Sequence, residues 1–233
     1  MLEYFLNNYF LLLYLLAFIL SLAKYRLYYD TILKYLPMVI AYTLLSEVLG
    51  LIVRDIDDIQ IIYKQEYYNY NTVIFNVFDI IFYLYFFYVY YHLIENSFGK
   101  KLIKYGSIVF LASCIINLFS QNFYIEPQNY AIIIGAIILL YATLTYLFNT
   151  QKTEKILPSY TNLLFWISIG IIIFYTCYPV TMYVLTFHYD IYEKYNLSQY
   201  HYACIGVFYT CIITGFVLMK RLRITNNSNQ NVV

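Results

Sequence analysis

Charged residues are scarce in this sequence, where aspartate, glutamate, lysine and arginine make up only 12% of 233 residues. Soluble domains are about a quarter charged, and 62% of this chain is hydrophobic, which excludes a large water-soluble domain. Glycine and proline are few as well, seven and four, and no linker or internal repeat is visible. A formal net charge of +1 gives no support to a nucleic-acid partner. The composition predicts an integral membrane protein.

Reactive motifs are also missing. The four cysteines lie inside apolar runs without a CxxC pair, so a disulfide framework is not expected. We find no phosphate-binding loop, serine nucleophile elbow or zincin motif. His201 and Cys204 lie three apart, a spacing that puts two ligands on one helix face, but two isolated side chains do not make a metal site. We predict no metal and no cofactor, and we favour a protein that is not an enzyme.

Seven apolar segments are long enough to cross a bilayer, which takes about 20 residues. Glu3 and the absence of Lys or Arg before the first segment argue against a secretory signal. The loops are short, so we expect an all-α single bundle of antiparallel transmembrane helices over residues 1–224, followed by a disordered polar tail, 225–233. The predicted helices cover residues 4–23, 35–53, 72–93, 102–119, 130–148, 160–187 and 200–219.

Basic residues divide unevenly between the two sets of loops that these helices define. Eleven of the fourteen fall on one side, and only Arg54, Lys64 and Lys194 fall on the other. Because Lys and Arg in short loops stay in the cytoplasm, the bias predicts an amino terminus outside and a carboxyl terminus inside. We expect the protein in the bacterial inner membrane, with membrane lipids as its immediate partners.

Polar side chains recur every three or four positions in the second and third segments, so each set shares one helix face. A carboxyl group is costly in hydrocarbon, and these faces should therefore point at protein or water. The stripes are Thr43, Glu47, Gly50 and Arg54 in the second segment, and Thr72, Asn76, Asp79, Tyr83, Phe87 and Tyr90 in the third.

Glu47 and Asp79 lie at the same predicted depth. Each is six or seven residues from the outer end of its helix, which at 1.5 Å per residue places both roughly 10 Å below the outer boundary. On consecutive antiparallel helices the two carboxyl groups could meet, and then share a proton or hold a cation. The alternative is that both are hydrogen-bonded and only lock the bundle together.

The sixth segment contains Pro179, which lacks a backbone donor and predicts a kink in its outer third. Interrupted helices at membrane depth often line cavities, although a kink can equally be a packing feature. Polar and aromatic residues near Pro179 and on neighbouring segments are further candidates for binding a ligand or ion. The residues predicted to bind a ligand or ion are Glu47, Asn76, Asp79, Tyr83, Asn117, Tyr175, Cys177 and His201.

Three stretches carry a family resemblance: SEVLG from Ser46 to Gly50, NVFDIIFYLYFFY from Asn76, and FWISIGIIIFY from Phe165 to Tyr175. With them the chain resembles uncharacterised seven-helix integral membrane proteins of the Bacteroidota, which are often encoded beside sensor histidine kinases. The resemblance implies an acid in the second helix and an Asn followed by an acid in the third, which here are Glu47, Asn76 and Asp79. It also implies a role in sensing, with a sensor histidine kinase or another membrane protein as partner.

These observations lead to one favoured function and two alternatives. The favoured function is binding of a small molecule, ion or lipid, for sensing or transport, in an outer-half cavity lined by the second, third, sixth and seventh segments. One alternative is a lipid-modifying intramembrane enzyme with Glu47 and Asp79 as acid and base. The other is a structural subunit whose polar residues bind partner helices.

Overall fold

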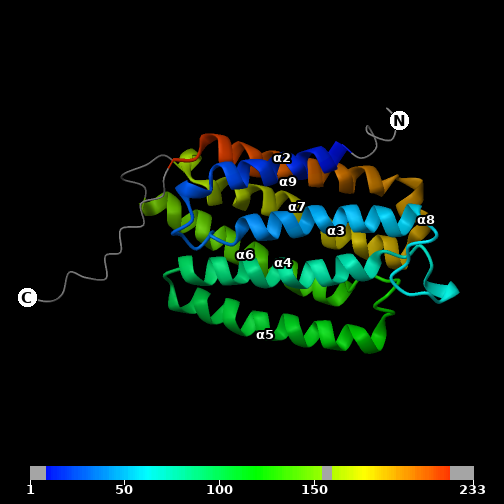
Figure 1. The fold of residues 1–233 in the computed structure, drawn as a ribbon. Coiled ribbons are helices and arrows are strands. Elements are labelled where there is room, and N and C mark those ends of the chain that lie inside the picture. Colours follow the sequence, from blue (N-terminus) through cyan, green and yellow to red (C-terminus); the bar gives the residue numbers. More distant parts are fainter. Residues whose placement is uncertain (1–8, 154–158, 221–233) are drawn as a thin grey trace, which may run out of the picture.

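The structure, a computed structural model, describes residues 9–153 and 159–220. Most of these residues are helical (Figure 1). No strand is found within these two ranges. The α-helices are α2 (Tyr9–Ala23), α3 (Leu36–Asp55), α4 (Thr72–Leu93), α5 (Ser97–Ser120), α6 (Asn129–Thr153), α7 (Leu163–Phe187), α8 (Tyr189–Lys194) and α9 (Leu197–Leu218). Three short 3-10 turns are η1 (Tyr25–Leu27), η2 (Gln65–Tyr67) and η3 (Ser159–Thr161).

Six helices, α3, α4, α5, α6, α7 and α9, are long and apolar enough to cross a membrane. The first apolar helix, α2, is shorter, with 15 described residues. The protein is therefore a multi-pass helical membrane protein by the length and composition of its helices. A seventh crossing remains a prediction, because residues 4–8 of the first predicted segment lie outside the described residues, as does the predicted tail, 225–233.

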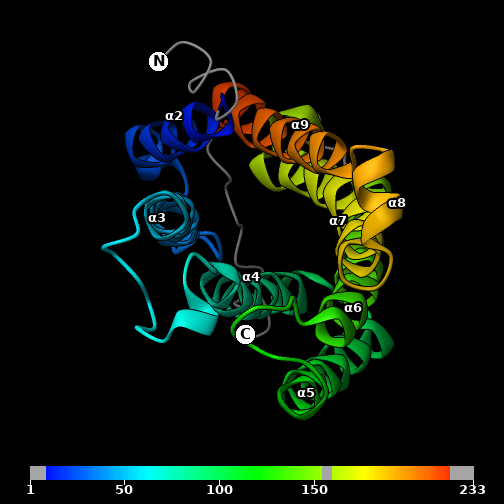
Figure 2. The ribbon, with the colours of Figure 1, turned by 90° about the vertical axis from the view of Figure 1, so that its right-hand side faces the viewer.

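The long helices form a ring, with α5 outside it (Figure 2). Around the ring α2 packs on α3, α3 on α4, α4 on α6, α6 on α7, α7 on α9, and α9 on α2. α5 lies outside, against α4 and α6. Short connections make consecutive long helices antiparallel, and α2 begins at the opposite end of the bundle from the one where α9 ends (Figure 1).

The contact between α7 and α9 is close because glycines line it. A Cβ atom at Gly170 would lie 2.6 Å from Cδ2 of Phe208, and one at Gly215 would lie 2.9 Å from Cδ1 of Leu163. Lipid tails are as apolar as leucine, so helices in a membrane gain more from close packing at small residues than from the hydrophobic effect. Phe208 thereby lies against the backbone of α7.

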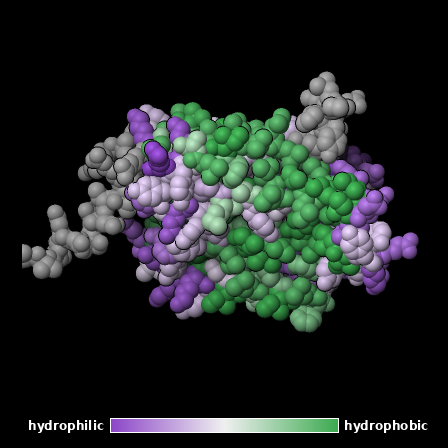
Figure 3. Space-filling view, in the orientation of Figure 1, coloured by the Kyte–Doolittle hydropathy of each residue, from purple (hydrophilic) through white to green (hydrophobic). Residues whose placement is uncertain are grey.

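The surface has the pattern of a membrane protein. In Figure 3 hydrophobic residues cover the middle of the visible face, and hydrophilic residues gather at its two ends. Large apolar side chains such as Phe119, with 88% of its surface exposed, and Ile137, with 63%, would be a liability in water. They are the expected contact surface for lipid tails.

Several helix boundaries differ from the sequence prediction, among them the beginnings of α9 and α5. The predicted loop from 188 to 199 contains α8, and Asn196 with a positive φ of 48° then turns the chain into α9. Asn tolerates this left-handed conformation better than most residues, so the turn needs no glycine. α5 begins at Ser97 rather than 102, because the Asn96 side chain accepts a hydrogen bond from the backbone N–H of Phe98 and caps a helix that extends beyond its apolar part.

Candidate ligand-binding cavity

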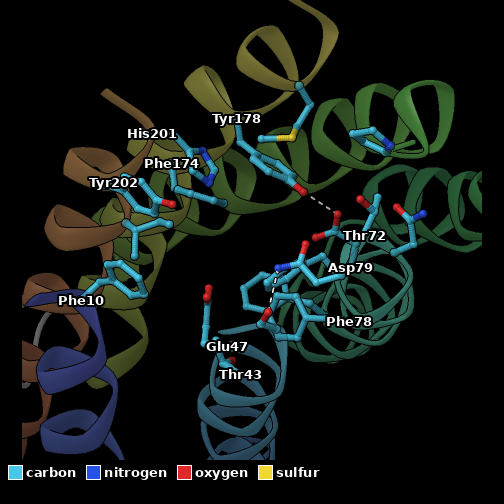
Figure 4. A pocket seen from close by; sticks show the side chains of 18 of the residues that line it. Phe10, Thr43, Glu47, Thr72, Phe78, Asp79, Phe174, Tyr178, His201 and Tyr202 are labelled. Carbon is cyan, nitrogen blue, oxygen red and sulfur yellow. Dashed lines mark hydrogen bonds between the residues drawn. The ribbon is translucent and has the colours of Figure 1, made fainter. Parts of the chain in front are cut away.

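A cavity of about 340 Å³ lies inside the ring, between α3 and α4 on one side and α7 and α9 on the other (Figure 4). Tyr14 of α2 also lines it. It occupies the half of the bundle in which α3 and α7 end and α4 and α9 begin, and the residues that reach deepest into the bundle include Thr43 and Phe82. The polar and charged residues of its lining are Thr43, Glu47, Arg54, Asn71, Thr72, Asn76, Asp79 and His201, together with six tyrosines.

Asp79 is held in the cavity wall by a tyrosine from across the ring. Its side chain is only 8% exposed, and the hydroxyl of Tyr178 donates a 2.6 Å hydrogen bond to its Oδ2 (Figure 4). The two residues belong to α4 and α7, so this bond connects opposite sides of the cavity. The hydrogen bond fixes the orientation of the carboxyl group in the cavity wall.

Glu47 has a comparable arrangement on α3. The hydroxyl of Tyr14, from α2, donates a 3.1 Å hydrogen bond to its Oε1. Tyr14 itself is fixed by an edge-on contact with the ring of Tyr209, with 4.2 Å between ring centroids. The Glu47 side chain points into the space between the helices (Figure 4).

The two carboxyl groups share a cavity but not a hydrogen bond. Each accepts from its own tyrosine, and among the described residues no hydrogen bond joins Glu47 to Asp79. Their second oxygens, Oε2 and Oδ1, receive no donor from the described part of the chain. Both acids therefore line one cavity, their common depth in the membrane stays a prediction, and the described chain gives no hydrogen bond through which they would share a proton directly.

His201 and Arg54 contribute the basic groups of the lining. The Nδ1 atom of His201 is buried and has no hydrogen-bond partner among the described residues. Its ring packs against those of Phe174 and Tyr178, with centroids 5.8 and 5.6 Å away. Arg54 lies at the end of α3, where its Nε is 2.7 Å from Oδ1 of the exposed Asp55.

Asn76 lines the cavity but uses its amide on the chain between α5 and α6. Its Nδ2 donates to the carbonyl oxygens of Phe123 and Glu126, at 2.8 and 2.9 Å, and its Oδ1 accepts from the N–H of Gln128 at 3.2 Å. Only 2% of the Asn76 surface is exposed. The side chain therefore anchors the segment that brings Pro127 to the cavity edge.

Five of the eight predicted site residues line the cavity: Glu47, Asn76, Asp79, Tyr175 and His201. The other three are not brought to it. Tyr83 is buried and donates a 3.0 Å hydrogen bond to the carbonyl of Ile132 in α6. Asn117 belongs to α5, outside the ring, and Cys177 is exposed on α7.

Pro179 does not interrupt its helix, since α7 is continuous from Leu163 to Phe187. The hydroxyl of Thr181 donates to the Cys177 carbonyl at 3.0 Å, next to the position of the missing backbone donor. The predicted segment is thus one continuous helix, and the kink at Pro179 stays a prediction. Tyr175 and Tyr178, which precede Pro179, both line the cavity.

Sequence reasoning missed the two tyrosines that hold the acids and the contribution of α2. The chain contains 32 tyrosines, so neither Tyr14 nor Tyr178 was singled out as a candidate. Tyr178 was recognisable only by its place beside Pro179. No pattern within the first segment connected Tyr14 with Glu47, which is 33 positions away.

Fold and cavity together define a polytopic helical membrane protein with two carboxyl groups held inside its bundle. Comparison with protein-family models, curated proteins and solved structures finds no match to this chain.

Proposed function

We propose that this protein binds a small ligand in the cavity between α3, α4, α7 and α9, and that it acts in sensing or transport in the bacterial inner membrane. The observation that carries the proposal is open volume next to oriented carboxyl groups. Ionisable residues inside a membrane bundle are expensive and mark functional sites by default. A concave site of about 340 Å³ with a few converging polar groups is typical of small-molecule binding.

The same observation argues against a purely structural lock. A lock would fill the space around Glu47 and Asp79 with packed side chains, because empty volume in a core lowers stability. Here each acid keeps one oxygen without a protein donor in the described chain, beside the cavity. The tyrosines orient the acids, and the remaining oxygens are left for a ligand.

The direction of entry and the partner follow from the sequence. The cavity lies at the end of the bundle that carries Asp55 at the end of α3 and Asp57, Asp58 and Glu66 between α3 and α4. The charge bias of the loops assigns this end to the outside, so the ligand enters from there. The resemblance to proteins encoded beside sensor histidine kinases adds such a kinase as the partner that reads the bound state.

The test is a thermal-unfolding screen of the purified protein with a library of metabolites, ions and lipids. A ligand that binds only the folded state raises the unfolding temperature. We expect at least one compound to stabilise the wild type and to stabilise Glu47→Gln and Asp79→Asn less. Glu193→Gln, an exposed acid on α8, serves as the matched control and should respond like the wild type. A stabilising compound that acts equally on all four proteins would place its site elsewhere.

A further inference from the structure

The cavity wall is much richer in aromatic rings than the chain as a whole. Twelve of its 26 lining residues are Phe or Tyr, against an aromatic share of 22% in the sequence. The abundance of tyrosine in the chain therefore does not account for the lining. Phe174 is central to this wall: it stacks on Tyr178 at 5.0 Å and on Phe208 at 5.8 Å between ring centroids. Ring faces of this kind attract cations and apolar groups.

The charges in the cavity have one sign except at its edge. Glu47 and Asp79 each have one oxygen that receives no donor from the described chain, and among the described lining residues Arg54 is the sole Lys or Arg. Arg54 is exposed at the end of α3 and paired with Asp55, so its charge lies at the edge of the cavity. An anionic ligand in the interior would meet two carboxyl groups, whereas a positively charged ligand would meet both acids and ring faces.

The size of the cavity distinguishes an organic cation from a metal ion. At about 30 Å³ per water molecule, a cavity of about 340 Å³ has room for roughly ten water-sized groups. A bare ion would use one of these places and would need several converging oxygen ligands. The described residues contain no group of three or more His, Cys, Asp or Glu side chains able to hold a metal.

The carboxyl oxygens indicate the form of the cationic group. Oε2 of Glu47 and Oδ1 of Asp79 receive no donor from the described chain, and both are acceptors. A protonated amine has N–H groups to donate to these oxygens, and a quaternary ammonium group does not.

From these observations, and resting on the proposed function, we propose that the ligand is a protonated organic amine of roughly ten non-hydrogen atoms with an apolar or aromatic body. Its ammonium group binds between Glu47 and Asp79, and its apolar body lies against the wall around Phe174. The ligand binds without formation or cleavage of a covalent bond.

Three probes of similar shape and different charge test this assignment by calorimetric titration and thermal unfolding of the purified full-length protein. They are phenethylamine, 2-phenylethanol and phenylacetate, which carry a positive, neutral and negative group on the same ring. We expect phenethylamine to bind at least tenfold more tightly than the alcohol, and phenylacetate to show no binding. The N-trimethyl form of phenethylamine should bind severalfold more weakly, because it has no N–H to donate.

Variants then assign the site. Asp79→Asn should weaken phenethylamine binding at least tenfold, and Phe174→Leu should weaken it severalfold without changing the preference for the cation. Glu193→Gln should bind like the wild type. If Asp79→Asn does not fold, the wild-type ranking of the probes and the Phe174→Leu variant still decide the question.

Two results overturn the inference. One is that 2-phenylethanol or phenylacetate binds as tightly as phenethylamine, and the other is that none of the probes binds. Either result leaves the proposed function to the library screen, in which a neutral or anionic compound that loses its effect in Glu47→Gln or Asp79→Asn would keep the cavity as the site with a different ligand class.

Discussion

Tyr178 and Asp79, 99 positions apart in the sequence, are joined by a 2.6 Å hydrogen bond across the interior of the ring. The same pair of helices, α4 and α7, is connected nearer the other end by Tyr90 and Ser168, whose hydroxyl groups lie 2.8 Å apart. α4 and α7 are not neighbours around the ring, so side chains that cross its interior connect them. Removing one of these connections should affect both stability and the cavity.

Tyr178→Phe removes the hydroxyl and leaves Asp79 without its donor. Hydrogen bonds to charged groups contribute about 1.5–3 kcal/mol, and we expect the free energy of unfolding to fall by about that amount. Denaturant or thermal unfolding of the purified protein measures it. Tyr183→Phe, on the same helix but exposed, should change stability by much less. Equal effects of the two substitutions would show that the bond contributes nothing.

Asn76→Leu removes the anchor of the segment between α5 and α6. Three hydrogen bonds of roughly 1 kcal/mol each are lost, so we expect a destabilisation of about 3 kcal/mol. Hydrogen exchange should also become faster in residues 121–128. Val77→Leu, a change at an exposed neighbour on α4, is the control. Unchanged exchange in that segment would contradict the anchoring role of Asn76.

Gly170→Ala tests the close contact between α7 and α9. The new Cβ would lie 2.6 Å from Phe208 Cδ2 and 3.2 Å from the Phe208 carbonyl oxygen, and the second atom is backbone that cannot rotate away. Overpacking of this kind typically costs about 1–3 kcal/mol. Gly206→Ala is the comparison, because the atoms nearest to its Cβ would be side-chain atoms of Tyr9, at 3.3 Å or more. We expect Gly206→Ala to unfold near the wild-type temperature and Gly170→Ala clearly below it.

Cysteine labelling tests the predicted orientation. In a background with the four native cysteines replaced, we expect Lys64→Cys to react with a membrane-impermeant maleimide on intact spheroplasts. Lys101→Cys, on the exposed side of α5 near its start, should react only after the membrane is opened. The opposite pattern would reverse the orientation and place the cavity toward the cytoplasm.

The helix faces of the candidate site could be predicted from the sequence, because periodicity alone defines a face. Thr43, Glu47, Gly50 and Arg54 form the predicted stripe of the second segment, and all four line the cavity. In the third segment Thr72, Asn76 and Asp79 line it too. Burial of this stripe follows from the cost of polar groups in lipid, and needs no knowledge of the neighbouring helices.

The neighbours of each face could not be predicted, because helix order around a bundle depends on packing between segments far apart in the chain. Tyr83 belongs to the predicted stripe, but its hydroxyl donates a hydrogen bond to the α6 backbone and does not line the cavity. Asn117 was expected to contribute from the fourth segment, and α5 lies outside the ring. For the same reason the partners of the two acids, Tyr14 and Tyr178, became recognisable only from the structure.

The position of α5 outside the ring has a consequence for how this protein can change over evolutionary time. α5 packs mainly on α4 and α6, none of its residues is among the described lining of the cavity, and Ile115, Ile116 and Phe119 are exposed. A substitution at those positions needs only to keep an apolar side chain in contact with the lipid tails. We therefore expect one apolar residue to replace another freely along that face during evolution. In contrast, Gly170 and Phe208 are in close contact between α7 and α9, and we expect a change at one of them to require a change at the other.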